Sequence, residues 1–174
     1  TIKAIDKDIT DLNNDLDYRL RYNIQIDIES YQDKIDSLRD RVSSLPESVS
    51  DKKSEFNSRL DTIQSKLQQK QDVQDAINKV VDALNKADDS LSDEDIQAAQ
   101  DAIDELPEGV DKTGYNNQLR AIKQKAQAVV AQKISDANAA VTKASRTKSL
   151  EDLNKAIELV NALPDCPQKD QLNA

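Results

Sequence analysis

The sequence predicts an all-α protein, elongated and built from tandem three-helix bundles that are joined by long shared helices. Three observations lead to this prediction. Apolar residues recur at steps of three and four, which is the spacing of one face of a helix. The 174 residues include only two Gly and four Pro, too few for the frequent turns of an all-β protein. One pattern of roughly 60 residues also occurs three times along the chain.

The repeat is marked by Leu-Pro followed by an acid, with the same apolar ladder before it and the same basic and apolar residues after it. The three Leu-Pro-acid segments are residues 45–47, 106–108 and 163–165. The ladders are Ile35, Leu38, Val42 and Leu45; Ile96, Ala99, Ile103 and Leu106; and Leu153, Ala156, Val160 and Leu163. The downstream pairs are Lys53 and Phe56, Lys112 and Tyr115, and Lys169 and Leu172. Agreement on both sides of the proline indicates a true internal repeat.

Each repeat is expected to hold three helices. The second helix begins at Ser92 or Ser149, because a serine side chain can accept a backbone N–H and acids in the following turn suit the helix dipole. Ser30 is the nearest candidate in the first repeat. The Leu-Pro segment ends this helix, since the residue before proline avoids the helical region. The third helix is then expected to begin near Asp51 and near Lys112.

No break separates one repeat from the next. From Lys52 to about Ala87 the chain has no Gly and no Pro, and the wholly polar stretch Gln68–Asp72 separates two apolar stripes on different faces. We predict one helix of about 50 Å, at about 1.5 Å per residue, that is shared by two bundles. Residues 112–144 repeat this arrangement, which resembles spectrin-type arrays.

The predicted domains are a first bundle over residues 1–68, a second over 69–126 and a third over 127–174. The third is shortened, because its last helix has only begun at Leu172. We therefore expect the natural protein to continue with further repeats or another domain. The chain starts at Thr1 with no visible signal peptide, which suggests a processed or excised part of something larger.

Composition argues against several functional classes. The chain has no His and one Cys, so the commonest acid–base group and metal ligand, an internal disulfide and a thiolate zinc site are all missing. A net charge of −9 opposes nucleic-acid binding. No apolar run is long enough to span a membrane. We expect no enzymatic activity, no cofactor, no metal, no nucleic acid and no membrane insertion.

Acids are concentrated between Lys86 and Lys112, and four of them surround one predicted loop: Asp88, Asp89, Asp93 and Asp95. Clustered carboxylates can bind Ca²⁺, but the EF-hand spacing with its central Gly is absent. Paired carboxylates also serve glycosidases, which need a rigid cleft that narrow bundles rarely provide. A solvated loop with helix-start acids is the favoured interpretation, and dependence on Ca²⁺ stays open.

Aromatic residues are concentrated in the first repeat. Between Tyr18 and Ile28 the apolar residues alternate as in a strand, but they also step by four, and we favour a helix with apolar residues on two faces. Tyr and Arg are good anchors for a partner. The candidate face for a partner or polymer consists of Tyr18, Arg19, Arg21 and Tyr22, with Arg39 and Arg41 as further basic residues. Ordinary core and surface packing is the simpler alternative.

Two segments carry a resemblance to a known family: Val160-Asn161-Ala162-Leu163-Pro164, and Ser58-Arg59-Leu60 with Ile63. They resemble helical repeats of extracellular proteins from Gram-positive bacteria, and the chain from residue 30 onward is similar to the α-helical N-terminal regions of S-layer proteins. This resemblance implies a secreted, wall-associated chain. In some S-layer proteins the equivalent region binds anionic secondary cell-wall polymer through basic residues, whereas the present chain is acidic overall.

From the repeat and the resemblance together we expect a non-catalytic structural spacer or scaffold segment of a bacterial cell-surface or S-layer-type protein, located at the wall or surface of a Gram-positive bacterium. Its partners would be cell-wall polymer or neighbouring surface-protein domains. The alternative is a helical module that binds cell-wall polymer or a host protein. An intracellular coiled-coil-like scaffold is a third possibility.

Overall fold

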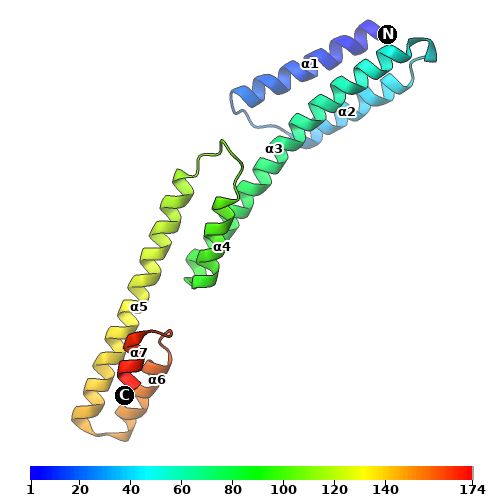
Figure 1. Ribbon diagram of the computed structural model, residues 1–174. Coiled ribbons are helices and arrows are strands. Elements are labelled where there is room, and N and C mark those ends of the chain that lie inside the picture. Colours follow the sequence, from blue (N-terminus) through cyan, green and yellow to red (C-terminus); the bar gives the residue numbers. More distant parts are fainter. Residues whose placement is uncertain (174) are drawn as a thin grey trace. The chain divides into compact units, whose positions relative to one another are not determined.

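The computed structural model describes residues 1–173, and all regular structure in this range is helical, which confirms the predicted all-α class (Figure 1). The elements are α1 (Ile2–Arg21), α2 (Ile28–Ser43), the 3-10 turn η1 (Glu47–Val49), α3 (Ser50–Ser90), α4 (Asp93–Asp104), α5 (Thr113–Thr147), α6 (Leu150–Asn161) and α7 (Pro167–Asn173). Two compact units are present, one from Thr1 to Asp75 and one from Ala76 onward. Each is described by itself.

The first unit contains α1, α2 and the N-terminal part of α3. Each helix contributes one stripe of apolar side chains at steps of three and four to a shared core. The buried residues of this core are Ile5, Ile9, Leu12, Leu16, Tyr31, Ile35, Leu38, Val42, Leu45, Phe56, Leu60, Ile63 and Leu67. Full burial of one such aliphatic or aromatic side chain contributes about 1.5–3 kcal/mol, so this stripe-to-stripe packing is the main force that holds the unit together.

Charged pairs at the edge of the core connect every pair of helices in the first unit. Arg41 of α2 pairs with Asp8 of α1 at 2.7 Å, and Lys66 of α3 pairs with Asp17 of α1 at 2.6 Å. A third pair, between α2 and α3, joins the Arg39 guanidinium to the carboxylate of Asp61 at 2.7 Å. These side chains are partly exposed, and such pairs contribute at most about 1 kcal/mol each. Their main effect is to fix the register of the helices.

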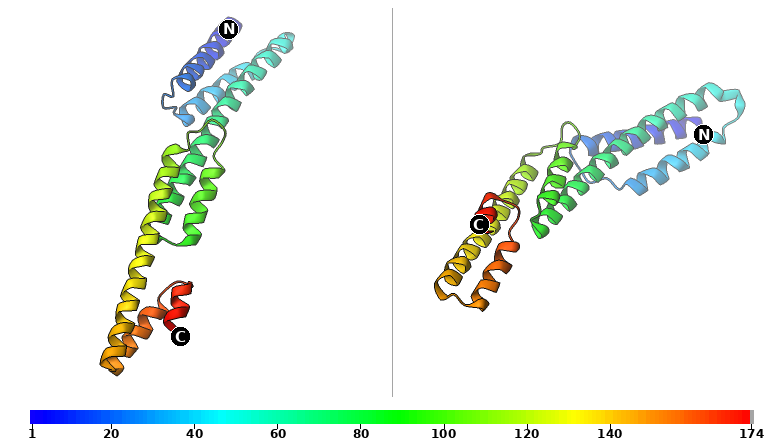
Figure 2. Two further views of the ribbon diagram at one scale, coloured as in Figure 1. Left: turned by 60° about the vertical axis from the view of Figure 1, so that its left-hand side comes forward. Right: turned by 60° about the horizontal axis from the view of Figure 1, so that its bottom comes forward.

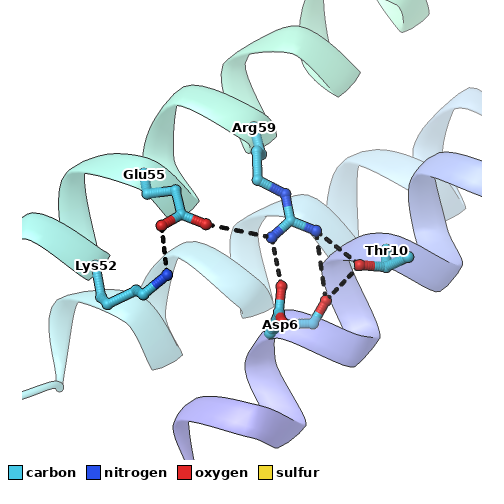
Figure 3. A network of polar contacts seen from close by, with 5 residues as sticks. All are labelled: Asp6, Thr10, Lys52, Glu55 and Arg59. Atoms are coloured by element: carbon cyan, nitrogen blue, oxygen red, sulfur yellow. Dashed lines mark hydrogen bonds and ion pairs between the residues drawn. The ribbon is translucent and has the colours of Figure 1, made fainter.

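A polar network between α1 and α3 centres on Arg59 of α3 (Figure 3). Its guanidinium contacts the Asp6 carboxylate and donates from Nη2 to Oγ1 of Thr10 at 2.7 Å, both on α1. Glu55 lies one turn before Arg59 and pairs with Lys52 at 2.6 Å. Because a guanidinium presents several donors in a fixed plane, Arg59 can hold two residues of α1 at once in a defined geometry.

The second unit contains the remainder of α3 and the helices α4 to α7. One core of this unit consists of Val80, Leu84 and Ala87 from α3, Ile96, Ala99, Ala102 and Ile103 from α4, Leu106, and Leu119 and Ile122 from α5. A smaller core consists of Ala137, Val160 and Leu163, with Ile134, Val141, Leu159 and Leu172 packed partly against it. Here α6 and α7 lie against the C-terminal part of α5 (Figure 1).

Two helices each carry residues of two cores. The 41-residue helix α3 supplies Phe56 to Leu67 to the first core and Val80 to Ala87 to the second. The 35-residue helix α5 does the same for the second and third cores. Its ribbon can be followed without a break in Figure 2. An unbroken helix therefore occupies each of the two stretches for which one was predicted, and the arrangement of tandem bundles that share these helices stays a prediction. The boundaries predicted after residues 68 and 126 lie inside α3 and α5, and the division into three domains stays a prediction.

The predicted helix ends are correct at most positions. The three Leu-Pro segments follow the last residues of α2, α4 and α6, and α3 and α5 begin at Ser50 and Thr113. The side chain of Ser92 caps α4, as predicted, by accepting the backbone N–H of Asp95 at 3.2 Å. Ser149 occupies the cap position of α6 without making a side-chain cap bond.

Two predictions for the first unit are wrong. Asp27, not Ser30, caps α2, and its carboxylate accepts the backbone N–H of Ser30 at 3.1 Å. The helix expected from residue 18 to residue 28 ends at Arg21, because Asn23 adopts a left-handed φ of 51° that closes the turn into α2. Asparagine tolerates this conformation better than most residues. Ile26 and Ile28 then pack against the first core from outside α1.

Candidate functional site

The predicted partner-binding face lies at the C-terminal end of α1. Tyr18 and Tyr22 are one turn apart, and 57% and 60% of their surfaces are exposed. Their ring centroids lie 4.8 Å apart with the rings tilted by 52°. The structure therefore brings the two tyrosines together as an exposed aromatic pair, which is an arrangement that can contact a sugar ring or an apolar side chain.

The arginines of this face differ in their surroundings. Arg19 donates from Nε to the Asp15 carboxylate at 3.2 Å and from Nη1 to the carbonyl of Gln25 at 3.3 Å, so it ties the loop after α1 to the helix. The Asp15 hydrogen bond raises the pKa of Arg19. Arg21 is exposed. Since successive residues of a helix are about 100° apart, Arg19 and Arg21 lie on opposite sides of the tyrosine pair.

The further basic residues of the first repeat do not extend this face. Arg39 pairs with Asp61, and Arg41 pairs with Asp8, so both guanidinium charges are matched by carboxylates of neighbouring helices. A polyanion would have to compete with these pairs. Of the predicted cations, Arg21 is the one that we expect to meet an anionic ligand first.

An open groove of about 480 Å³ runs between α1 and α2. Leu12 and Leu38 are its buried apolar residues. The remaining lining is polar or charged and consists of Asp8, Asp11, Asp15, Asp33, Lys34, Ser37 and Arg41. Sequence analysis missed this groove, because acids at steps of three and four on α1 look like an ordinary solvated face. The only available signal was that Asp8, Asp11 and Asp15 share one side of the helix.

Tyr31 of α2 belongs to the core of the first unit and lies beside this groove. Its ring is buried, and its hydroxyl donates a hydrogen bond to the carboxylate of Asp15. Burial, together with this carboxylate, raises the pKa of Tyr31 to about 12. The same hydrogen bond lowers the pKa of Asp15, with Arg19 acting in the same direction. The pair holds α2 against α1 while Asp15 keeps its charge.

The raised pKa of Tyr31 predicts an alkaline loss of stability. Folded Tyr31 keeps its proton to about pH 12, whereas its ordinary pKa is 10.0, so the stabilisation is complete below pH 10 and falls as the pH rises from 10 towards 12. In Tyr31→Phe this pH dependence should be smaller, and stability at pH 8 should be about 1 kcal/mol lower because a buried hydrogen bond is lost. Urea unfolding from pH 8 to pH 11.5 measures both effects.

A matched control for this experiment is Tyr22→Phe, which removes an exposed hydroxyl from the same unit. Tyr22→Phe should keep the full alkaline loss. If Tyr31→Phe and the unchanged chain lose stability in parallel above pH 10, the hydrogen bond between Tyr31 and Asp15 does not contribute as described.

Two of the four acids around the loop before α4, Asp88 and Asp95, have local partners. Asp95 pairs with Lys86 at 2.8 Å, and the hydroxyl of Ser92 donates to it at 3.1 Å. The Lys86 contact, with help from Ser90 and Ser92, lowers the pKa of Asp95 to about 2. Asp88 pairs with Lys125 of α5 at 2.8 Å. Over residues 1–173 the structure contains no group of three or more acidic, His or Cys side chains that could hold a metal ion.

Two further results bear on the whole chain. None of the described helices combines the length and the apolar character that crossing a bilayer requires. Comparisons of the chain with models of protein families, with curated proteins and with solved structures give no match.

Proposed function

We propose that the chain is a non-catalytic spacer or scaffold segment in which three-helix bundles follow one another and share long helices, as in spectrin-type arrays. The observation that carries this proposal is α3, one uninterrupted helix of 41 residues that contributes to two cores. A hydrogen-bonded helix without Pro or Gly bends only gently. A shared helix would therefore hold successive bundles at a set spacing.

Three further features support this proposal. The helix α5 repeats the design of α3. Among the described residues every buried side chain is apolar or aromatic. The cores of this part of the chain therefore hold no buried charged group of the kind that catalytic sites use. Of all residues, 33% are charged, which keeps a long surface soluble and separate from its neighbours.

The location that we propose is the wall or surface of a Gram-positive bacterium, within an S-layer-type or other cell-surface protein. This part of the proposal rests on the resemblance carried by residues 160–164 and 58–60 with Ile63.

The spacer proposal is tested by the distance between two spin labels on exposed positions of α3. Labels at Ser54 and Asn85, in a chain whose Cys166 is replaced by Ser, are separated by about 46 Å if about 1.5 Å per residue holds throughout. Pulsed electron paramagnetic resonance should give one narrow distribution near this distance. A broad or double distribution would exclude a stiff spacer.

The second candidate function is a binding module for cell-wall polymer or a host protein, and the exposed pair of Tyr18 and Tyr22 favours it. The measurement is retention on purified Gram-positive walls, with and without their secondary polymer, at low and physiological salt. If the face binds polymer, Tyr22→Ala or Arg21→Ala should reduce retention roughly tenfold. Arg120→Ala, which removes one exposed cation from α5, is the matched control and should have no such effect. Equal retention of all variants would exclude this face.

A further inference from the structure

The helix α6 presents a stripe of exposed apolar side chains. Leu150 is 73% exposed, and Leu153 and Ile157 are each 49% exposed. Their spacing of three and four places them along one side of the helix. Beside them lies a hollow of about 210 Å³, whose walls include Val141 and Ala144 of α5 and Leu172 of α7. Apolar surface of this kind, continuous with a hollow, is typical of a site that another element covers.

The internal repeat shows what covers the same position elsewhere in the chain. The counterparts of Leu153 are Ile35 in the first repeat and Ile96 in the second, and these are only 0% and 8% exposed. In the first repeat the covering helix is α3, through Phe56 to Leu67, and in the second it is α5, through Leu119 and Ile122. Each covering helix is the next α-helix after a Leu-Pro segment.

The helix α7 occupies the first turns of this covering position in the third repeat. Leu172, the counterpart of Phe56 and Tyr115, packs partly against the third core. Lys169 donates from Nζ to the carbonyl of Leu163 at 3.0 Å, just after the end of α6. Its counterpart Lys112 makes the same kind of contact, to the carbonyl of Asp104 at the end of α4, at 2.8 Å. The uncovered stripe therefore continues an interface that α7 has already begun.

At two positions of α6 the residue is aliphatic, whereas the corresponding residues of the other two repeats are polar or charged. Leu150 corresponds to Gln32 and Asp93, and Ile157 corresponds to Arg39 and Gln100. In the other repeats three of these polar residues, Gln32, Arg39 and Gln100, contact the covering helix. Their contacts are Gln64 to Gln32 at 2.6 Å, Arg39 to Asp61 at 2.7 Å and Lys123 to Gln100 at 3.1 Å. The third repeat has aliphatic side chains where these contacts would be.

We propose that this face seats one further helix, which runs along α6 in the register in which α5 runs along α4. This helix carries aliphatic side chains at the two positions that correspond to Asp61 and Gln64 of α3, and we call these two positions its flank. An aliphatic flank suits this face because Leu150 and Ile157 bury more apolar surface against it and offer a polar side chain no hydrogen-bond partner. This proposal rests on the repeat register and not on the spacer role, so the two can fail separately.

The test adds a covering helix of known sequence to the full chain. Since Leu172 corresponds to Tyr115, a second copy of residues 118–133 placed directly after Ala174 continues the register. One graft keeps the native sequence. A second carries Arg120→Leu and Lys123→Leu within the copied segment, which supplies the aliphatic flank. A third has the residues of the second in scrambled order.

The readout is amide hydrogen exchange of α6, with oligomeric state followed by light scattering. We expect the aliphatic-flank graft to slow exchange in α6 at least tenfold relative to the scrambled graft, and more than the native graft does. Ile157→Gln, which restores the residue type of Gln100, should reverse the order of the aliphatic and native grafts.

Two outcomes would overturn the proposal. One is equal exchange in all three grafts, since no helix would then be seated on this face in the register of the repeat. The other is concentration-dependent protection of α6 without any graft, together with a dimer in light scattering. In that case the stripe would be covered by a second copy of the chain.

Discussion

Replacing Phe56 with alanine is expected to lower the free energy of unfolding of the first unit by about 3–5 kcal/mol. Phe56 is one of the largest fully buried side chains, and it lies where α3 meets the core formed with α1 and α2. The substitution removes the ring from the core and leaves a cavity that rigid helices cannot close. It also removes the ring beneath the Arg59 guanidinium, which lies 5.9 Å from the ring centroid. Native-state hydrogen exchange, read separately for α1–α2 and for α4–α6, measures the loss in each unit.

The matched control for Phe56→Ala is Ser58→Ala, an exposed position two residues further along the same helix. It should change stability by no more than about 0.5 kcal/mol. The loss in Phe56→Ala should be concentrated in α1 and α2, because these helices share its core. A loss below about 1 kcal/mol would mean that the first core does not depend on this ring.

Replacing Gln69 with proline is expected to have a comparable effect through a different mechanism. Gln69 lies within α3, in the polar stretch between the residues of the first core and those of the second. Proline removes the backbone hydrogen bond to Ser65, four residues earlier, and its ring clashes with that carbonyl, at a cost of about 3 kcal/mol or more. The distance distribution between labels at positions 54 and 85 should become broader and shift to shorter values.

Gln69→Ala is the control for this variant, since alanine is a better helix former at the same exposed position. It should leave the distance distribution as narrow as that of the unchanged chain. An unchanged distribution in Gln69→Pro, with little loss of stability, would show that α3 is not continuous through this stretch in solution. The spacer proposal would then lose its main support.

The long helices could be predicted from the sequence because their determinants are local. The absence of Gly and Pro between Lys52 and Ala87 leaves nothing to stop the helix, and apolar steps of three and four mark the face that each core buries. The Leu-Pro segments mark the helix ends by backbone sterics alone. The same local logic located the cap at Ser92.

The loop after α1 could not be predicted in this way, because its determinants compete. Leu20, Ile24 and Ile28 have helical spacing, while the left-handed Asn23 and the capping carboxylate of Asp27 end one helix and begin the next. The need for α2 to fold back on α1 decides between them, and that need is tertiary. The groove between α1 and α2 was missed for the same reason, because it exists only once the two helices are paired.

The candidate face of Tyr18, Arg19, Arg21 and Tyr22 stays a prediction as a binding site. The structure shows that the rings of Tyr18 and Tyr22 lie together. The separate role of Arg19 depends on Asp15 and on the carbonyl of Gln25, a residue beyond the helix end. The exposure of Leu153 could not be predicted from the apolar pattern either. Its position in the ladder predicts burial, but burial also needs a helix that covers this side of α6.

A helix that belongs to two cores also constrains how such a gene can change length. Substitutions in residues 68–72 alter a polar stretch that is exposed or half-buried, but inserting one residue there would turn every later side chain of α3 by about 100° about the helix axis. Seven inserted residues would turn them by only about 20°. We therefore expect natural variants of this chain to tolerate almost any polar substitution in this stretch. Insertions or deletions should be accepted mainly when they comprise about seven residues, which is close to two helical turns, or a multiple of that number.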